Sequence, residues 1–236
     1  MSVDRSHAFP NKIFRALPRP QAKRLLASCT VFDLSYGNVL FEPGEKMEYV
    51  YFPTSGLVSL LTPVTDSVNV EVGLVGNEGM AGISMVLGVR VSPVRLLVQG
   101  TGSALRVKAS VLRKAIEESP RLRRELNSYL YCLMAQVAQT AACNRYHAVA
   151  QRLARWLLMT QDRMQSDQFY LTQEFLAHML SVRRVGVTAA AGVLRKNNLI
   201  SYLRGNITIL DRLGLELASC DCYRTVNAIC DGAGST

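Results

Sequence analysis

Residues 170 to 211 constrain the fold of this chain more than any other segment. The run from Leu171 to Glu174 is typical of a helix start, because Thr172 can cap open backbone N–H groups and Glu174 lies favourably in the first turn. The buried side of this first helix would consist of Leu176, Met179 and Leu180. The segment Ser181-Val182-Arg183 then predicts a tight break in the helix.

A second helix is expected from about Arg184 to Asn197. Apolar residues at helical spacing would face its core: Val187, Ala190, Ala191 and Leu194. The runs 199–203 and 207–210 then predict a β-hairpin around the turn Arg204-Gly205-Asn206. Two helices around a three-residue turn, followed by such a hairpin, describe a winged helix-turn-helix.

The same pattern predicts which side chains of the second helix face outward and could contact DNA. Its N-terminal residues would meet base edges in the major groove. Arg184 could contact guanine O6 and N7 together, and Thr188 could contact a base or a phosphate. Val185 and Ala189 could meet a thymine methyl group. Side chains better placed for phosphates are Thr172, Gln173, Arg183, Arg195 and Arg204, although any single arginine could also be solvated surface.

Residues 30 to 108 show the pattern of a small barrel or roll. The β-rich runs YVYF, GLVSLL, VNVEVGLV and VRLLVQ are separated by turn clusters rich in glycine, proline and asparagine. Many short strands with such turns are typical of a closed or rolled sheet. We expect a brief helical stretch at 78–87, opened by residues 78–82, and one short N-terminal helix over 12–28 with Leu17, Leu25 and Leu26 buried.

Residues 120 to 145 predict a long helix, because they contain no glycine and no internal proline. Two overlapping sets follow the 4-3 spacing of a coiled-coil seam: Leu122, Leu126, Tyr129, Leu133, Gln136 and Thr140, and Leu126, Leu130, Leu133, Val137 and Thr140. A helix apolar on two faces can pack against its own domain and against a second copy of the chain. We therefore expect a dimerisation helix, with an ordinary core helix as the alternative. Its candidate contacts are Leu126, Tyr129, Leu130, Leu133, Val137 and Thr140.

The chain resembles the cyclic-AMP-receptor-protein/Fnr (Crp/Fnr) superfamily of bacterial transcription regulators. The segment TQEFLAHMLSVRRVGVTAAAGVLRKNNLI is similar to that family's helix-turn-helix. EPGEKMEYVYFPTSGLVSLL, with Gly44 and Gly56, is similar to the first half of its cyclic-nucleotide-binding β-roll. GNEGMAG, residues 76–82, stands where the family has its phosphate-binding cassette. The resemblance implies a homodimer that reads a two-fold symmetric site in double-stranded DNA.

The fold class implied is α+β, with a cyclic-nucleotide-binding-like β-roll, a long dimerisation helix and a C-terminal winged helix-turn-helix. We expect an N-terminal helical segment at 1–29 and the β-roll, as effector domain, at 30–108. A linker and the dimerisation helix would follow at 109–146, and the winged helix-turn-helix DNA-binding domain at 147–236.

Two departures from the family pattern bear on the ligand and on the DNA site. Cassettes that bind cyclic AMP carry a glutamate after the first glycine, but here Met80 follows Gly79. They also carry an Arg-Ser pair on the next strand, where this chain has Ser92-Pro93-Val94-Arg95. Cyclic AMP binding of the family's kind is therefore not expected. Val185 and Ala189 replace a glutamate and an arginine of the cyclic-AMP receptor, so its DNA preference is not carried over.

A small effector remains open, since backbone N–H groups at the start of the 79–87 stretch could bind an anion. The candidate effector-binding residues are Gly79, Met80, Ala81, Gly82 and Arg95. Such an effector would bias the dimerisation helix and so the spacing of the two recognition helices.

The formal charge of +9 favours a polyanionic partner, with nucleic acid first and an anionic membrane second. No apolar run reaches the ~18–20 residues of a membrane span, and the start MSVDRSHAFPNK lacks the apolar core of a secretory signal. These features lead us to expect a cytoplasmic protein, with RNA polymerase as a further candidate partner. No phosphate loop, G-x-S-x-G elbow or HExxH segment is found, so an enzyme is not expected.

The six cysteines do not form the regular pattern of a disulfide framework. Only Cys29 lies in the first hundred residues, so the superfamily's N-terminal iron–sulfur cluster is not expected. Cys220, Cys222 and Cys230 form a loose group that could bind metal or sense redox state, but no fourth ligand is evident. We therefore interpret them as buried or idle thiols and expect no metal, leaving His147 open only as a lone haem ligand.

Two other functions stay open at this level. The chain could be a ligand-sensing regulator that acts mainly through protein–protein contacts, with the winged helix as a docking module. It could also be an enzyme that uses the roll as its pocket.

Overall fold

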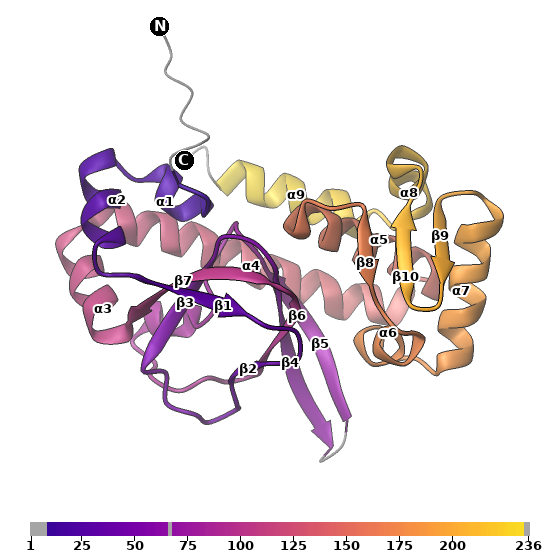
Figure 1. Cartoon of the computed structure of the whole chain (residues 1–236), viewed down its shortest axis with the longest axis horizontal. Helices are drawn as coiled ribbons and strands as arrows, with labels where there is room; N and C mark the ends of the chain where they lie inside the picture. Colours follow the sequence, from indigo (N-terminus) through magenta and orange to yellow (C-terminus); the bar gives the residue numbers. More distant parts are fainter. Residues whose placement is uncertain (1–8, 66–67, 234–236) are drawn as a thin grey trace, which may run out of the picture.

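The computed structural model describes residues 9–65 and 68–233; residues 1–8 of the expected N-terminal segment and the last three residues lie outside this part. Figure 1 shows an elongated molecule with a β-roll at one end and a winged helix at the other. The long helix α4 (Pro120–Tyr146) runs behind the roll toward the winged helix. This is the α+β arrangement that the sequence predicts.

The roll consists of two antiparallel sheets, with strand orders β1-β7-β3 and β2-β6-β4-β5. The strands are β1 (Thr30–Leu34), β2 (Val39–Phe41), β3 (Tyr49–Pro53), β4 (Leu57–Thr65), β5 (Val68–Val75), β6 (Arg95–Gly100) and β7 (Gly102–Lys108). The four runs quoted from the sequence form β3 to β6. Of the helical stretch predicted at 78–87, only the second half forms, as the short 3-10 helix η1 (Ile83–Leu87), whereas residues 78–82 are not helical.

The turn between β3 and β4 depends on Gly56. Its φ is +85°, and a Cβ at this position would lie 2.6 Å from the carbonyl oxygen of Gly100. Any other residue would therefore meet both backbone strain and a backbone clash. Glycine allows the ends of the two sheets to approach each other here.

The N-terminal helix is broken, contrary to the prediction of a single helix over 12–28. Helix α1 (Lys12–Ala16) ends at Leu17, and α2 (Arg19–Leu26) begins after Pro18. Leu17 has extended backbone angles, with φ −81° and ψ 150°. The ring of a following proline disfavours helical angles at the preceding residue, which explains the break. Leu17 and Leu25 are buried as predicted, whereas Leu26 is only half-buried.

One face of α4 closes the core of the roll. Helix α3 (Ala109–Glu118) precedes α4, and the side chain of Ser119 caps the start of α4. The face against the roll is formed by Leu122, Leu126, Tyr129, Leu133 and Gln136. Gln136 belongs on this apolar face because its amide bonds the backbone of Leu74, accepting from the N–H at 2.6 Å and donating to the carbonyl at 3.3 Å.

This packing corrects the predicted dimer contacts. Leu126, Tyr129 and Leu133 lie inside the chain's own core, so they are not available to a second copy. The physical reason is that two overlapping apolar stripes follow from one helical sequence, and periodicity does not say which stripe meets the sheet. The remaining candidates are half-buried at the edge of the core: Leu130, Val137 and Thr140.

A second face of α4 is covered by the C-terminal helix α9 (Cys222–Ala233), which lies along it in Figure 1. Ser128 donates a hydrogen bond to the carbonyl of Ala233 at 3.1 Å, and Gln139 donates to the Cys222 sulfur at 3.1 Å. Helix α9 was not anticipated from the sequence.

The third face of α4 is open in the described structure. It is formed by Asn127, Tyr131, Met134, Ala138 and Ala141, all exposed. We call these residues the open stripe. They follow the 4-3 spacing of a coiled-coil seam, and Tyr131 and Met134 are 57% and 63% exposed.

The winged helix has its own core, built on α5 (Val149–Met164). The other elements are β8 (Gln168–Tyr170), α6 (Gln173–Met179), α7 (Arg184–Lys196), β9 (Ile200–Leu203), β10 (Asn206–Ile209) and α8 (Arg212–Ala218). Strands β8, β10 and β9 form one antiparallel sheet in that order. Leu57, Leu61 and Leu74 of the roll belong to this core, so the two parts share an apolar junction.

Polar contacts, buried or half-buried, cross the same junction. Trp156 of α5 donates a hydrogen bond to Glu71 of β5 at 2.6 Å, and Ser59 donates to the other carboxylate oxygen. Arg163 forms an ion pair with Glu78 at 2.8 Å. Burial raises the pKa of Glu71 from 4.5 to about 7, although the Ser59 and Trp156 hydrogen bonds oppose this shift.

Among the described residues, no helix combines the length and the apolar character that crossing a membrane requires.

Candidate nucleic-acid interface

The turn between α6 and α7 follows the predicted break. Thr172 caps α6 by accepting the backbone N–H of Phe175 at 3.1 Å. Helix α6 ends at Met179 with Leu180 as its C-cap, and Ser181 takes a left-handed conformation with φ +50° before α7 starts after Arg183. This single reversal of the chain sets the two helices at an angle and leaves α7 on the surface.

The burial pattern predicted for α7 is confirmed. Its inner side consists of Val187, Ala190, Ala191 and Leu194. Arg184, Val185, Thr188, Ala189 and Arg195, the residues of this helix predicted to contact DNA, are all exposed, as are Gly192 and Lys196. Val185 is 73% exposed although it is apolar, so the surface carries methyl groups beside its charges.

Gln173 connects the start of α6 to the start of α7. Its side-chain carbonyl accepts a hydrogen bond from Thr188 at 3.0 Å and one from the Arg184 Nε at 3.4 Å. Thr188 also contacts the Arg184 carbonyl at 3.1 Å. The side chains of Arg184 and Thr188 are thus oriented before any ligand is bound.

The β9–β10 hairpin is fixed close to these helices. Arg204 and Gly205 both have positive φ, +49° and +86°, which is typical of a two-residue type I′ turn. The Gly205 carbonyl accepts the backbone N–H of Leu171 at 2.6 Å. Tyr202 donates to the Leu171 carbonyl at 2.8 Å. These contacts hold the wing against the start of α6.

Helices α6 and α7 and the hairpin enclose a groove of about 390 Å³. Its lining includes six of the nine residues predicted to contact DNA: Thr172, Gln173, Arg184, Thr188, Arg195 and Arg204. Arg183, Val185 and Ala189 are exposed but do not line it. Tyr170 and Tyr202 also line the groove and were not predicted to do so. Tyr170 lies on β8, which is only three residues long and gives no periodic signal, whereas Tyr202 lies on the predicted hairpin strand β9.

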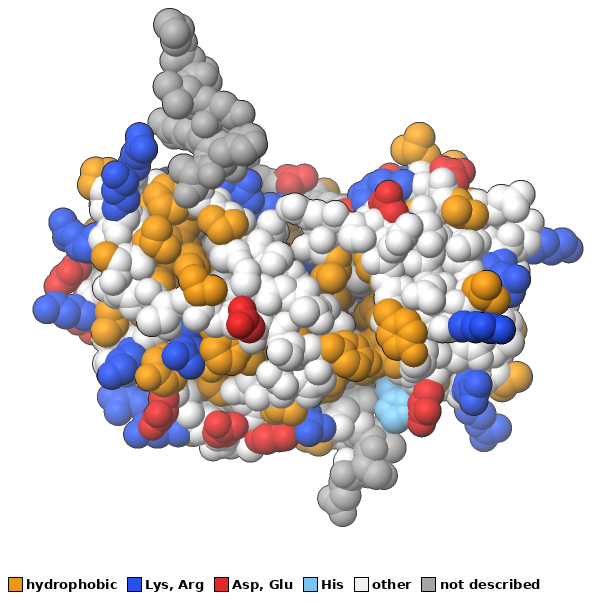
Figure 2. Space-filling model, in the orientation of Figure 1, with side chains coloured by type: hydrophobic (Ala, Val, Ile, Leu, Met, Phe, Trp, Pro, Cys, Tyr) orange, Lys and Arg blue, Asp and Glu red, His pale blue; other side chains and the backbone are white. Residues whose placement is uncertain are grey.

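The interface is basic. Between residues 170 and 211 the sequence has five Lys or Arg residues against two Asp or Glu residues. All five are exposed: Arg183, Arg184, Arg195, Lys196 and Arg204. Figure 2 shows basic side chains along the edge of the molecule formed by α7. A surface of this sign attracts a phosphate backbone.

The structure does not bring the candidate effector residues together. Met80 and Ala81 are buried, and Gly79 lies so close to the Tyr129 ring that a Cβ would overlap it. Arg95 instead forms an ion pair with Glu42 at 3.0 Å, in a groove that none of residues 79–82 lines. The cassette position is occupied by the chain's own core, which the sequence pattern could not reveal.

The comparisons with known proteins bear on the winged helix first. Residues 151–218 match a family model described as the Crp-like helix-turn-helix domain. This Crp-like domain extends from α5 to α8, so α9 lies beyond it. No curated protein matches the chain.

Solved structures extend the similarity to the β-roll and α4. FixK2 from Bradyrhizobium japonicum has a TM-score of 0.69 and 17% identity, covering 81% of this chain and 98% of that chain. The c-di-GMP responsive global regulator CLP of Xanthomonas campestris has a TM-score of 0.67 and 16% identity, covering 82% of this chain and 100% of that chain. A CRP-family transcriptional regulator from Thermus thermophilus has a TM-score of 0.64 and 18% identity, covering 80% of this chain and 96% of that chain. The chain has the fold of Crp/Fnr regulators, with its Crp-like domain at the expected end.

Proposed function

We propose that the protein is a sequence-specific DNA-binding transcription regulator that acts as a homodimer. The observation that carries this proposal is the exposed, basic start of α7, where Gln173 holds Arg184 and Thr188 in position. Side chains that project from the start of a recognition helix are the ones that meet base edges in the major groove.

Base contacts and phosphate contacts divide between different residues. Arg184 would pair with guanine O6 and N7, which is worth about 1–3 kcal/mol of discrimination. Val185 and Ala189 would contact thymine methyl groups, and Thr188 a base or a phosphate. Phosphate contacts would come from Thr172, Gln173, Arg183, Arg195 and the wing residue Arg204, which position the protein without reading sequence.

The homodimer would form through the open stripe of α4. A heptad-spaced stripe along a helix of 27 residues suits parallel packing against a second copy. Two copies of α7 would then face adjacent major grooves about 34–36 Å apart and read two half-sites related by two-fold symmetry. Residues 79–82 and Arg95 do not line a common groove, so this proposal includes no effector site at these residues.

Mobility-shift and footprinting experiments on genomic fragments test the proposal. We expect fragments that are bound in the presence of excess random DNA and a protected region with two-fold symmetry. The Lys23→Ala variant controls for the loss of positive charge, because it removes one exposed charge from α2 at the far end of the molecule, and it should bind the fragments as the wild type does. Equal binding to every fragment and to random DNA would contradict the proposal.

The alternative function, regulation mainly through protein contacts, makes the opposite prediction for cells. In that case an Arg184→Ala variant would control its target genes as well as the wild type does. The exposed apolar residues of α8, Leu213 and Leu217, would be suited to such a protein contact, since they are 74% and 78% exposed.

A further inference from the structure

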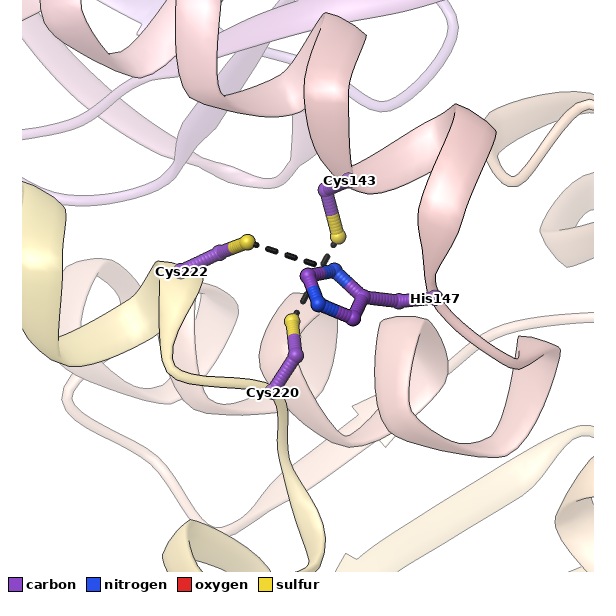
Figure 3. Close-up of side chains that lie close together, drawn as sticks. All are labelled: Cys143, His147, Cys220 and Cys222. Carbon is purple, nitrogen blue, oxygen red and sulfur yellow. Dashed lines mark hydrogen bonds between the residues drawn. The ribbon is translucent and has the colours of Figure 1, made fainter.

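Four metal-ligating side chains converge where α4 ends and α9 begins. They are Cys143, His147, Cys220 and Cys222, and we call them the cysteine–histidine cluster. Their donor atoms all lie within 4.8 Å of one another, and Figure 3 shows the side chains pointing toward a common centre. No fourth ligand was evident from the sequence, because Cys143 and Cys220 are 77 positions apart. Cys230, which follows Cys220 and Cys222 in the chain, instead interacts with Cys132.

The distances agree with those of a mononuclear tetrahedral site. The sulfurs of Cys143 and Cys220 are 3.4 Å apart, and the Cys222 sulfur is 3.4 Å from the His147 Nδ1. With metal–sulfur bonds of about 2.3 Å and metal–nitrogen bonds of about 2.0 Å, tetrahedral ligand atoms lie about 3.5–3.8 Å apart. A four-iron cluster would hold its ligand sulfurs farther from one another.

The cluster does not resemble ordinary apolar packing. Cys143, Cys220 and Cys222 are all buried, yet they form a group of their own, separate from both large cores. A single buried thiol usually packs among aliphatic side chains as a small apolar group. Three thiols and an imidazole directed at one another instead provide the donor set that Zn²⁺ prefers.

The surroundings supply compensating charge and a hydrogen bond to one sulfur. Arg152 and Arg155 are buried and line the same small cavity as Cys143. Hydrogen bonds from these side chains go to neutral acceptors, the Asn144 side chain and Leu180 carbonyl for one and Thr140 for the other. A divalent ion with three thiolates carries a net charge of −1, which these guanidinium groups would balance. Gln139 donates to the Cys222 sulfur at 3.1 Å, as residues around a metal site do for its ligands.

We propose that the cysteine–histidine cluster binds one Zn²⁺ ion as a structural site. Each of the three thiols loses its proton to solvent when it binds, and His147 binds through the neutral Nδ1. All four ligands lie outside residues 151–218, so the site does not belong to the matched helix-turn-helix domain. The ion fixes the start of α9 to the end of α4, beside the turn that leads from α4 into α5.

Cobalt titration of the full chain tests this proposal. The protein is purified under reducing conditions, stripped with a chelator and titrated with Co²⁺, which reports coordination through its absorption. We expect one Co²⁺ per chain, the visible bands of tetrahedral cobalt, and thiolate-to-cobalt charge transfer that disappears when Zn²⁺ is added. This measurement needs only the wild-type chain, so it does not depend on whether a variant folds.

Variants assign the ligands. We expect Cys220→Ser and His147→Ala to lower the Zn²⁺ affinity by more than about tenfold, since loss of a residue that only hydrogen-bonds a ligand already costs about 10–100-fold. Cys29→Ser is the matched control and should bind as the wild type does, because Cys29 bonds the Leu25 carbonyl in the N-terminal helices. Zn²⁺ should raise the melting temperature of wild type and control but not of Cys220→Ser.

Several outcomes would overturn the proposal. Octahedral or absent Co²⁺ absorption would show that the cluster does not bind metal tetrahedrally. Iron with acid-labile sulfide would show a different centre. A Cys143–Cys220 disulfide that persists under reducing conditions would exclude the site as described. Zn²⁺ binding that is unchanged in both Cys220→Ser and His147→Ala would exclude it as well.

Discussion

At the scale of single residues, Gln173 is the side chain that organises the DNA-facing end of α7. Because its carbonyl accepts from both Thr188 and Arg184, the nitrogen of the same amide can donate to a phosphate. Orientation before binding reduces the entropy cost of ordering a long arginine side chain. Base reading at Arg184 and phosphate contact at Arg204 should therefore be separable.

The first prediction compares Arg184→Ala with Arg204→Ala. We expect Arg184→Ala to weaken binding to the preferred site by about 1–3 kcal/mol and to relax selectivity at one base pair. Arg204→Ala should weaken binding to all sequences alike and reduce the salt dependence by about one phosphate contact. Competition binding on single-base DNA variants at several salt concentrations distinguishes the two. Uniform losses from Arg184→Ala would show that this arginine contacts only the backbone.

The second prediction concerns Glu71, whose pKa burial raises from 4.5 to about 7. The folded chain holds this proton more tightly than the unfolded chain does. Its contribution to stability is therefore complete below about pH 4.5 and is lost as the pH rises to about 7. The free energy of unfolding that this protonation contributes is about 3 kcal/mol at acid pH.

Denaturant unfolding of wild type and Glu71→Gln across this pH range measures the contribution. The glutamine amide of the variant keeps an acceptor for Trp156 and gains a donor for Ser59, so the difference should isolate the titration. Glu117→Gln, on the exposed side of α3, is the control and should follow the wild type. A wild-type profile parallel to that of Glu71→Gln would refute the assignment.

At the scale of elements, α4 shows what a periodic sequence can and cannot specify. Its length and the absence of glycine were enough to predict the helix, and the repeat of apolar residues predicted two packing surfaces. Which surface meets the chain's own sheet depends on partners that are distant in sequence, such as Leu74 on β5. The helix-turn-helix was predicted almost completely, because its burial pattern depends on contacts between neighbouring elements.

The cysteine–histidine cluster and α9 could not be predicted from the sequence. Cys143 and His147 are one helical turn apart and could have been paired from spacing alone. Their approach to Cys220 and Cys222 requires α9 to fold back along α4, which no local pattern indicates. The prediction of an effector site at residues 79–82 was wrong for a similar reason, because the Tyr129 ring that packs against Gly79 comes from a distant part of the sequence.

The third prediction separates the faces of α4. We expect Met134→Asp, on the open stripe, to convert a dimer into a monomer while the melting temperature of the chain stays within a few degrees. Leu133→Asp should instead prevent folding, because Leu133 is 5% exposed within the core of the roll and an unpaired charge there is costly. Val111→Asp, an exposed position on α3, is the matched control. Light scattering coupled to size exclusion gives the masses, and a monomeric wild type would contradict the proposed dimer.

At the scale of the whole molecule, the roll and the winged helix form one packed unit. Apolar residues of β4 and β5 join the core of the winged helix, and the Trp156–Glu71 and Arg163–Glu78 contacts cross the same junction. A change in the roll would therefore reach α7 through α5, on which α7 packs. The proposed zinc site lies beside the other connection, the turn from α4 into α5.

The fourth prediction concerns this junction. Trp156→Phe keeps most of the apolar packing but leaves a buried oxygen of Glu71 without its donor. We expect a loss of about 1–3 kcal/mol in unfolding free energy at neutral pH and a smaller loss at acid pH, where Glu71 is protonated. Tyr146→Phe, at a side chain that is 79% exposed, should have no comparable effect. Equal losses in the two variants would show that the Trp156 hydrogen bond does not stabilise the junction.

Sequence-specific recognition of DNA by the α7 surface is the central claim, and selection of DNA by the purified protein tests it most directly. The protein is incubated with a random library at a low and a higher salt concentration, and the bound DNA is sequenced. We predict enrichment of one two-fold symmetric sequence, retained at higher salt while non-specific binding falls. Failure to enrich any sequence at either salt concentration would contradict the claim.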